Sequence, residues 1–138
     1  DQVRSHMEKH AAIIRPKFDL AFKIFRTELG DKNIATWCEP RGGYFISFNT
    51  LPGCAKQVVQ MAAAAGVELT NAGATFPYGN DPQDQNIRIA PTYPPLKELQ
   101  TALELFAVCV QLVSVEQILQ RRKFTPERLP EQNTAQIV

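Results

Sequence analysis

Two long helical patterns, one at each end of the chain, enclose a middle section of short strands. Of all the features of the sequence, this order of elements most limits the folds that the chain can adopt. In the first thirty residues, Pro16 removes the hydrogen bond to the carbonyl of Ala12, so we expect a kink or break there. Gly30 predicts the end of this helix. The apolar residues of the pattern recur every three or four positions, as on one helix face: Met7, Ala11, Ile14, Phe18, Phe22, Phe25 and Leu29.

The second helical pattern spans residues 94–123 and begins with two prolines, which suit a helix entrance. Two adjacent apolar stripes predict a wide buried face. The strongly apolar part, residues 105–115, is too short for a membrane span. Residues 124–138 are polar and contain prolines, which predicts a mobile tail. The stripes consist of Leu96, Leu99, Leu103, Phe106, Val110 and Val113, and of Ala102, Leu105, Cys109 and Leu112.

Between these helices, short runs of β-branched and aromatic residues alternate with Gly and Pro. The turn Glu-Pro-Arg-Gly-Gly at 39–43 joins the first two runs into a predicted hairpin, and a long loop is expected at 71–85. This order predicts an α+β fold with a small, largely antiparallel sheet covered on one face by helices. The predicted elements are strands at 34–38 and 44–49, a helix at 55–65, and short strands at 67–70 and 86–90.

The composition is that of a globular chain with almost no net charge. Lys and Arg number 15 against 14 Asp and Glu, and hydrophobic residues make up 44%. This balance argues against a disordered chain and gives no reason to expect a nucleic-acid or membrane partner. Cys38, Cys54 and Cys109 form no CxxC pair, which predicts free, buried thiols. Because the first residues also lack the apolar segment of a signal peptide, we expect a cytoplasmic protein.

Most catalytic and metal-binding patterns are absent from the sequence. His6 and His10 have a spacing that can present two imidazoles to a metal, but no third ligand accompanies them, which favours surface histidines. Asp81 and Asp84 lack the twelve-residue calcium pattern, which favours a solvated loop. Neither a GxSxG motif nor a Walker loop occurs. We therefore expect no metal and no catalytic side chain in this chain.

Arg88 is the strongest candidate for a binding residue. Alternation along its predicted strand places Ile87 and Ile89 on one face and Arg88 on the other. A guanidinium held on a strand presents two parallel N–H donors to a carboxylate. The residues alone leave open an alternative, an ordinary solvated arginine on a half-exposed sheet.

Three segments together resemble one enzyme family. Residues 86–91, Asn-Ile-Arg-Ile-Ala-Pro, resemble the substrate-carboxylate segment of class I aminotransferases, which are fold-type I enzymes dependent on pyridoxal phosphate. Residues 40–45, Pro-Arg-Gly-Gly-Tyr-Phe, resemble the Pro-x-Gly-Gly-aromatic-aromatic hairpin of that family. Residues 66–76 resemble its stretch ending in Pro-Gly-x-x-Phe, although Asn71 and Ala72 stand where the family usually has Pro or a small residue.

The resemblance covers residues 1–121 and is greatest to a bacterial aspartate-type group whose loop reads Gly-Ala-Thr-Phe-Pro-Tyr-Gly, as residues 73–79 do. It implies a small C-terminal domain, residues 1–123, followed by the tail at 124–138. In such enzymes the large domain supplies the lysine, the aspartate and most phosphate contacts that hold the cofactor. None of these is recognisable here, since no lysine has the Ser/Thr-rich context of the cofactor lysine. The seven lysines are Lys9, Lys17, Lys23, Lys32, Lys56, Lys97 and Lys123.

The resemblance also implies a function for the intact enzyme. It would transfer an amino group between an amino acid and a 2-oxo acid with pyridoxal phosphate, as a homodimer. Arg88 would hold the substrate α-carboxylate, and Tyr44, Thr75 and Phe76 would border the pocket. The isolated chain is expected to be inactive and to hold no cofactor. The alternative is an independent α+β module that binds a ligand or partner, or a regulatory or oligomerisation unit. The amino donor and the oligomeric state of the isolated domain stay open.

Overall fold

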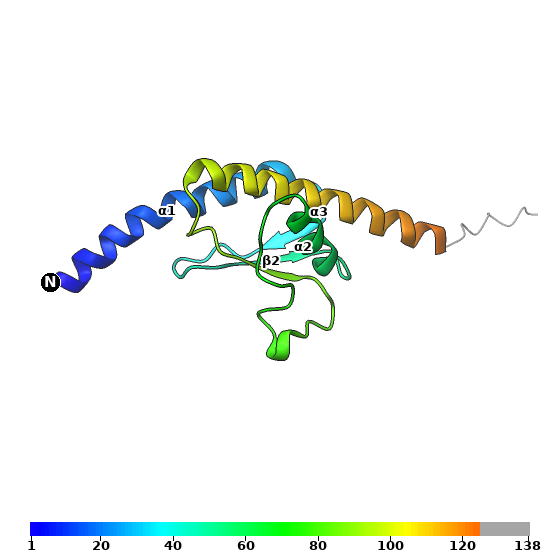
Figure 1. Ribbon diagram of the computed structural model, residues 1–138, viewed down its shortest axis with the longest axis horizontal. Coiled ribbons are helices and arrows are strands. Elements are labelled where there is room, and N and C mark those ends of the chain that lie inside the picture. The colour runs from blue at the N-terminus through cyan, green and yellow to red at the C-terminus, as the bar shows by residue number, and fades with distance from the viewer. Residues whose placement is uncertain (125–138) are drawn as a thin grey trace, which may run out of the picture.

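Three helices and a three-stranded antiparallel sheet make up the part of the protein that the computed structural model describes, residues 1–124 (Figure 1). The strands pair in the order β1-β2-β3. Figure 1 shows α1 and α3 side by side across one face of the sheet, and their outer ends extend beyond it in opposite directions. The predicted α+β class is therefore confirmed. The elements are α1 (Gln2–Leu29), β1 (Ala35–Trp37), β2 (Ile46–Thr50), α2 (Ala55–Ala64), the 3₁₀ turn η1 (Pro77–Gly79), β3 (Asn86–Ile89) and α3 (Leu96–Phe124).

The core lies between the sheet and the two long helices. The Phe48 ring of β2 lies 5.2 Å from that of Phe25 on α1 and 5.0 Å from that of Phe106 on α3, measured between ring centroids. Tilted and edge-on aromatic contacts of this kind add about 0.5–1.5 kcal/mol each beyond the apolar area that they bury. The helix-facing side chains of β2 and β3 are all buried: Ile46, Phe48, Ile87 and Ile89.

Of the kink or break expected at Pro16, the break does not occur, since helix α1 continues through its internal proline. The carbonyl of Ala12 loses its helical donor, but the residue is exposed and water can hydrate it. The inner half of α1 is buried as its spacing predicts, whereas Met7 is 65% exposed. This difference arises because the outer half of α1 extends beyond the sheet (Figure 1).

Helix α3 buries a narrower face than the two apolar stripes predict. Its first stripe is buried from Leu99 to Val113, but Leu96 is exposed at the helix start. In the second stripe Cys109 is buried, whereas Leu112 is 52% exposed, so the expectation of a wide buried face is wrong. By length and composition alone α3 could cross a membrane, although core helices of globular proteins meet the same criterion.

The segment after α2 forms a helix cap instead of the strand predicted at 67–70. The amide of Gly66 donates to the carbonyl of Ala63, and that of Val67 donates to the carbonyl of Ala62. This is the Schellman arrangement, and the φ of +90° at Gly66 is the left-handed conformation that it requires. The amide of Val67 therefore completes the end of α2 and does not pair with the sheet.

The hairpin prediction is confirmed, since β1 and β2 pair antiparallel. The second strand begins at Ile46, two residues later than predicted. All three cysteines are free, but only Cys54 and Cys109 are buried, so the prediction of burial is wrong for Cys38. Burial raises the pKa of both buried thiols. The predicted tail lies outside the described residues except for Phe124, which ends α3.

Candidate functional site

The side of the sheet away from the helices is polar and carries Arg88. Alternation along β2 and β3 places Ser47, Asn49, Asn86 and Arg88 on this side, opposite the buried isoleucines and Phe48. The strand register sets Arg88 opposite Ser47 and Asn86 opposite Asn49. We call this surface the polar face. Its backbone is held rigidly by the strand pairing, so Arg88 projects from a fixed position.

The guanidinium of Arg88 is stacked on an aromatic ring. Its Cζ atom lies 4.5 Å from the ring centroid of Phe45, the residue just before β2. A cation–π contact at a partly exposed site contributes about 0.5–1 kcal/mol, and the ring restricts the plane of the guanidinium. The buried Nε of Arg88 has no hydrogen-bond partner among the described residues. Its N–H is thus left for an acceptor from outside this part of the chain.

Asn86 fastens the long loop at 71–85 to the polar face. Its amide nitrogen donates to Ser47 Oγ at 2.9 Å and to Asn49 Oδ1 at 2.8 Å, and its Oδ1 accepts from Thr75 Oγ1 at 2.5 Å. Its backbone carbonyl accepts from the amide of Gly73 at 3.1 Å. Through these hydrogen bonds Asn86 holds the loop at 71–85 in place beside the strand that carries Arg88.

Asp81 fixes the returning half of the same loop. Its carboxylate accepts from the backbone amides of Gln83 at 3.0 Å, and of Gln85 and Asn86 at 2.8 Å each. Burial alone would raise the pKa of Asp81, but backbone hydrogen bonds, including one from Asp84, hold the pKa below its usual 3.8. The sequence places Asp81 only in a solvated loop. The signal for its role is Asp-Pro turn chemistry, because an Asp side chain often bonds amides that follow it.

We expect Asp81→Asn to lower the free energy of unfolding by about 1 kcal/mol at neutral pH, since water screens this partly exposed carboxylate. A lowered pKa in the folded state means that the ionised carboxylate stabilises the protein fully above the usual value of 3.8. That contribution is lost as the pH falls through the lower folded-state pKa. Urea unfolding at several pH values should therefore show a difference between the two proteins that shrinks in acid. A difference that stays constant with pH would contradict this role.

The residues predicted to border the pocket lie in two places. Thr75 contacts Asn86 beside the polar face, and Phe76, 36% exposed, follows it in the loop. Tyr44 lies elsewhere, with its ring centroid 5.8 Å from that of His10. The aromatic residue in contact with Arg88 is Phe45, which sequence reasoning did not select. Strand alternation is the signal that could have found it, since it puts positions 45 and 47 on the same side. Whether the three predicted residues border a substrate pocket stays a prediction.

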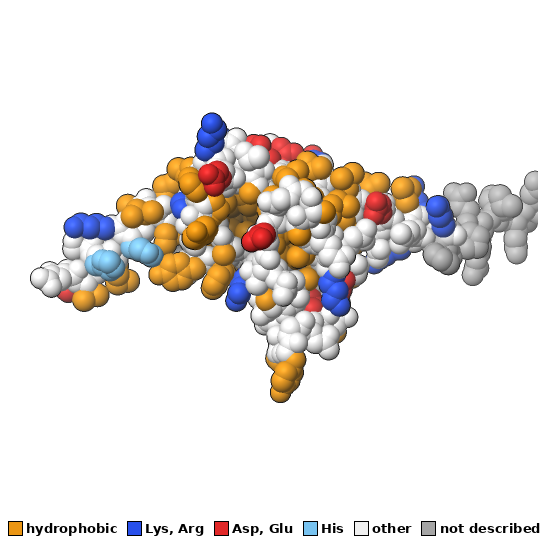
Figure 2. Space-filling view, in the orientation of Figure 1, with side chains coloured by type: hydrophobic (Ala, Val, Ile, Leu, Met, Phe, Trp, Pro, Cys, Tyr) orange, Lys and Arg blue, Asp and Glu red, His pale blue; other side chains and the backbone are white. Residues whose placement is uncertain are grey.

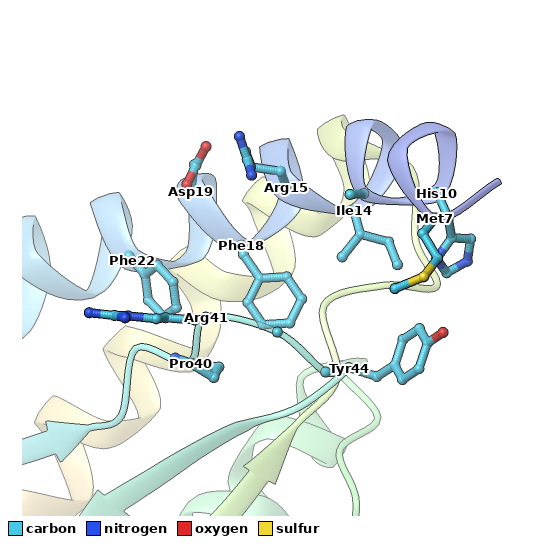
Figure 3. Close-up of a pocket in the computed structure, with 13 residues that line it drawn as sticks. Met7, His10, Ile14, Arg15, Phe18, Asp19, Phe22, Pro40, Arg41 and Tyr44 are labelled. Atoms are coloured by element: carbon cyan, nitrogen blue, oxygen red, sulfur yellow. The ribbon is translucent and has the colours of Figure 1, made fainter. Parts of the chain in front are cut away.

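Apart from the polar face, a cavity of about 640 Å³ lies between α1 and the turn before β2 (Figure 3). Ile14 and Phe18 point into it from α1, whereas Arg15 and Asp19 point away, and Tyr44 lies across from the helix. Its lining shares no residue with the hollow of about 120 Å³ that Arg88 helps to line beside β3. The larger cavity is therefore separate from the polar face.

The described residues contain no group of three or more His, Cys, Asp or Glu that could hold a metal ion. His6 and His10 stack with their ring centroids 6.3 Å apart on the outer half of α1. A guanidinium held on a paired strand, as Arg88 is, can bind an anion such as a carboxylate.

The chain is similar to known proteins over most of its length. A family model described as aspartate amino-transferase matches residues 1–122. The chain is 45% identical over 119 residues to a Mycolicibacterium smegmatis protein described as an aminotransferase, covering 86% of this chain and 28% of that protein. It is 43% identical over 114 residues to an aspartate aminotransferase of Corynebacterium glutamicum, covering 83% and 26%.

Solved structures of aminotransferases are also similar to this chain. The crystal structure of an aspartate transaminase from Corynebacterium glutamicum superposes with a TM-score of 0.82 at 43% identity, covering 83% of this chain and 27% of that one. An α-aminoadipate aminotransferase from Thermus thermophilus, complexed with N-(5'-phosphopyridoxyl)-L-leucine, has a TM-score of 0.72, covering 84% and 29%. At 14% identity this second likeness shows the fold alone. The chain spans about a quarter of the length of the curated relatives that it matches.

Proposed function

Since the chain belongs to the aspartate aminotransferase family, we propose that it supplies the substrate-carboxylate site of a transaminase. In this proposal Arg88 binds the α-carboxylate, and the whole protein transfers an amino group from an amino acid, aspartate above all, to a 2-oxo acid. The observation that carries the proposal is the placement of Arg88. It projects from a paired strand onto the polar face, rests on Phe45, and has no hydrogen-bond partner at Nε among the described residues.

The recognition follows from the chemistry of both substrates. An amino acid and a 2-oxo acid differ at Cα but share the α-carboxylate, so one guanidinium can hold both. Two parallel N–H···O bonds to a carboxylate fix its direction as well as its position. Because Phe45 and the strand restrict the guanidinium, the bound Cα is oriented along with the carboxylate. Orientation of this kind is a large part of what a binding site contributes to rate.

The described residues do not themselves fit a pyridoxal phosphate site. The polar face carries no lysine, because the lysines of this chain lie on the three helices and in the turn after α1. Lys17 is tied by a 2.6 Å hydrogen bond from Nζ to the carbonyl of Thr92. We therefore assign the cofactor and its lysine to the remainder of a longer protein, which the partial coverage of the relatives supports. A cytoplasmic location and a homodimeric intact enzyme stay predictions.

The test is an amino-transfer assay on the full-length protein that contains this chain. Purified with pyridoxal phosphate, that protein should form a new amino acid from aspartate and a 2-oxo acid, measured by chromatography, and residues 1–138 alone should not. The proposal would be overturned by a full-length protein that folds and binds a ligand but transfers no amino group between any tested amino acid and 2-oxo acid. It would favour the independent binding module, for which the cavity beneath α1 has a suitable size.

A further inference from the structure

The guanidinium of Arg88 has no counter-ion in the described part of the chain. No acidic side chain of residues 1–124 lies within ion-pair distance of it. Glu68 is exposed and lines the same hollow beside β3, but it forms no such pair. The carboxylate of Asp81 accepts backbone amides instead, including that of Asn86. A partly buried arginine usually has an acidic partner, because burial of an unpaired charge is unfavourable.

The side chains that the strands place next to Arg88 are uncharged. Ser47 lies directly opposite it on β2, and Asn86 lies two residues before it on β3, on the same side of the sheet. Residues two apart on a strand have their Cα atoms about 7 Å apart, within reach of an arginine side chain. Figure 2 shows mainly uncharged surface over the loop at 71–85 as well, which projects below the sheet in Figure 1.

Asn86 anchors the loop without carrying a charge. Its side chain is buried and forms hydrogen bonds with those of Ser47, Asn49 and Thr75. An aspartate of the same size could accept from the two hydroxyl groups, but it would place a negative charge within reach of Arg88. In a partly buried site such a carboxylate attracts a guanidinium strongly. The amide therefore holds the loop in place and leaves the guanidinium unpaired.

We propose that Asn86 is a positioning residue for carboxylate binding, whose uncharged side chain keeps Arg88 unpaired so that the substrate α-carboxylate becomes its counter-ion. This role rests on the proposed function, because it requires Arg88 to bind the substrate. In the unliganded protein the guanidinium is held by its strand and by the ring of Phe45. The substrate then gains the whole attraction of the guanidinium. An internal carboxylate would have to be displaced first, which would subtract from substrate affinity.

Steady-state kinetics of Asn86→Asp in the full-length enzyme test this role. We expect KM to rise about tenfold or more for the amino acid and for the 2-oxo acid, because both substrates share the α-carboxylate. Competition at Arg88 weakens the binding of ground state and transition state alike, so kcat should change by less than about threefold. Asn86→Ala removes the anchor without adding a charge, and it should raise the two KM values less than Asn86→Asp does.

Ser47→Asp is a second variant that does not depend on a change at a buried position. Ser47 is exposed and lies opposite Arg88, so a carboxylate there can form a cross-strand ion pair and should raise the same two KM values. Gln83→Glu is the matched control for an added charge. Gln83 is exposed in the same loop, and its backbone carbonyl accepts from the amide of Gly53. Both KM values should then match those of the unmodified enzyme, and circular dichroism confirms that each variant is folded.

Crystal structures of the unliganded full-length enzyme give a readout that does not use activity. In the Asn86→Asp variant, an oxygen of the new carboxylate should lie within about 4 Å of a guanidinium nitrogen of Arg88, the distance of an ion pair. In the unmodified enzyme, no carboxylate from any part of the longer protein should lie that close to Arg88. A carboxylate from the remainder of the protein that already pairs with Arg88 would overturn the proposed role.

Two kinetic results would also overturn the role of Asn86. One is a pair of unchanged KM values in both Asn86→Asp and Ser47→Asp, and the other is an equal rise of KM in Asn86→Ala and Asn86→Asp. Arg88→Lys separates such a failure from a failure of the proposed function. If Arg88→Lys lowers kcat/KM strongly and the two acidic variants have no effect, only the role of Asn86 is wrong. If Arg88→Lys leaves kcat/KM nearly normal, the carboxylate binds elsewhere and both proposals are wrong.

Discussion

Replacement of Arg88 by lysine in the full-length enzyme should lower kcat/KM for amino transfer by roughly a hundredfold or more, the equivalent of about 3 kcal/mol. A lysine keeps the charge but offers the carboxylate a single point of contact in place of two parallel donors. It also loses the planar stacking on Phe45, whose ring lies 4.5 Å from the guanidinium carbon. Binding and orientation should therefore weaken together, with KM raised and kcat lowered.

The measurement is steady-state kinetics with the absorbance of the bound cofactor as a second readout, which should not change. Arg15→Lys is a suitable control, because Arg15 points away from the cavity under α1 and lies far from the polar face in sequence and fold (Figure 3). Its kcat/KM should match that of the unmodified enzyme. An Arg88→Lys enzyme with nearly normal kcat/KM would refute the assignment of the carboxylate site.

Truncation of Phe48 to alanine should lower the free energy of unfolding by about 3–5 kcal/mol. Phe48 is fully buried, and its ring is in contact with those of Phe25, Phe106 and Trp37. Its removal leaves a cavity where α1, the sheet and α3 meet. Because a domain of this kind is stable by about 5–15 kcal/mol in total, the loss is a large share of its stability.

The matched control is Phe45→Ala, three residues earlier. Phe45 is 48% exposed on the opposite side of the sheet, so its truncation should cost about 1 kcal/mol or less. Urea unfolding of both variants measures the difference. In the full-length enzyme Phe45→Ala should weaken substrate binding more than Phe48→Ala does, since Phe45 and not Phe48 contacts Arg88. Equal losses of stability in the two variants would contradict the described packing of β2.

The sequence predicts the parts of the fold that local rules control. Alternation along β3 puts Arg88 on the side opposite Ile87 and Ile89, and the burial of these two isoleucines agrees. A glycine directly after the helix predicted at 55–65 favours a left-handed helix end, and the φ of +90° at Gly66 agrees. These predictions succeed because each depends on a few neighbouring residues.

The remaining features depend on parts of the chain that are distant in sequence. Periodicity identifies an apolar helix face but not what covers it. Met7 is exposed where α1 extends past the sheet, and Leu112 is exposed because it lies on the side of α3 opposite the buried Val110 and Val113. Alternation places Phe45 on the same side as Arg88, but the contact between them depends on the register of β2 with β3, which pairs residues about forty positions apart. The amides that the Asp81 carboxylate binds lie in or next to a loop whose shape no periodic pattern describes.

The continuity of α1 through Pro16 has a mechanical consequence. A helix of 28 residues is about 42 Å long, and the sheet is attached to its inner half. A rotation of about five degrees at the outer end displaces the inner end by roughly 3.5 Å, which is more than the length of a hydrogen bond. Since Asn86 and Asp81 fasten the loop at 71–85 to β3, that loop travels with Arg88 as one body. A small tilt of α1 would therefore move Arg88 and this loop together, without changing any backbone angle near Arg88.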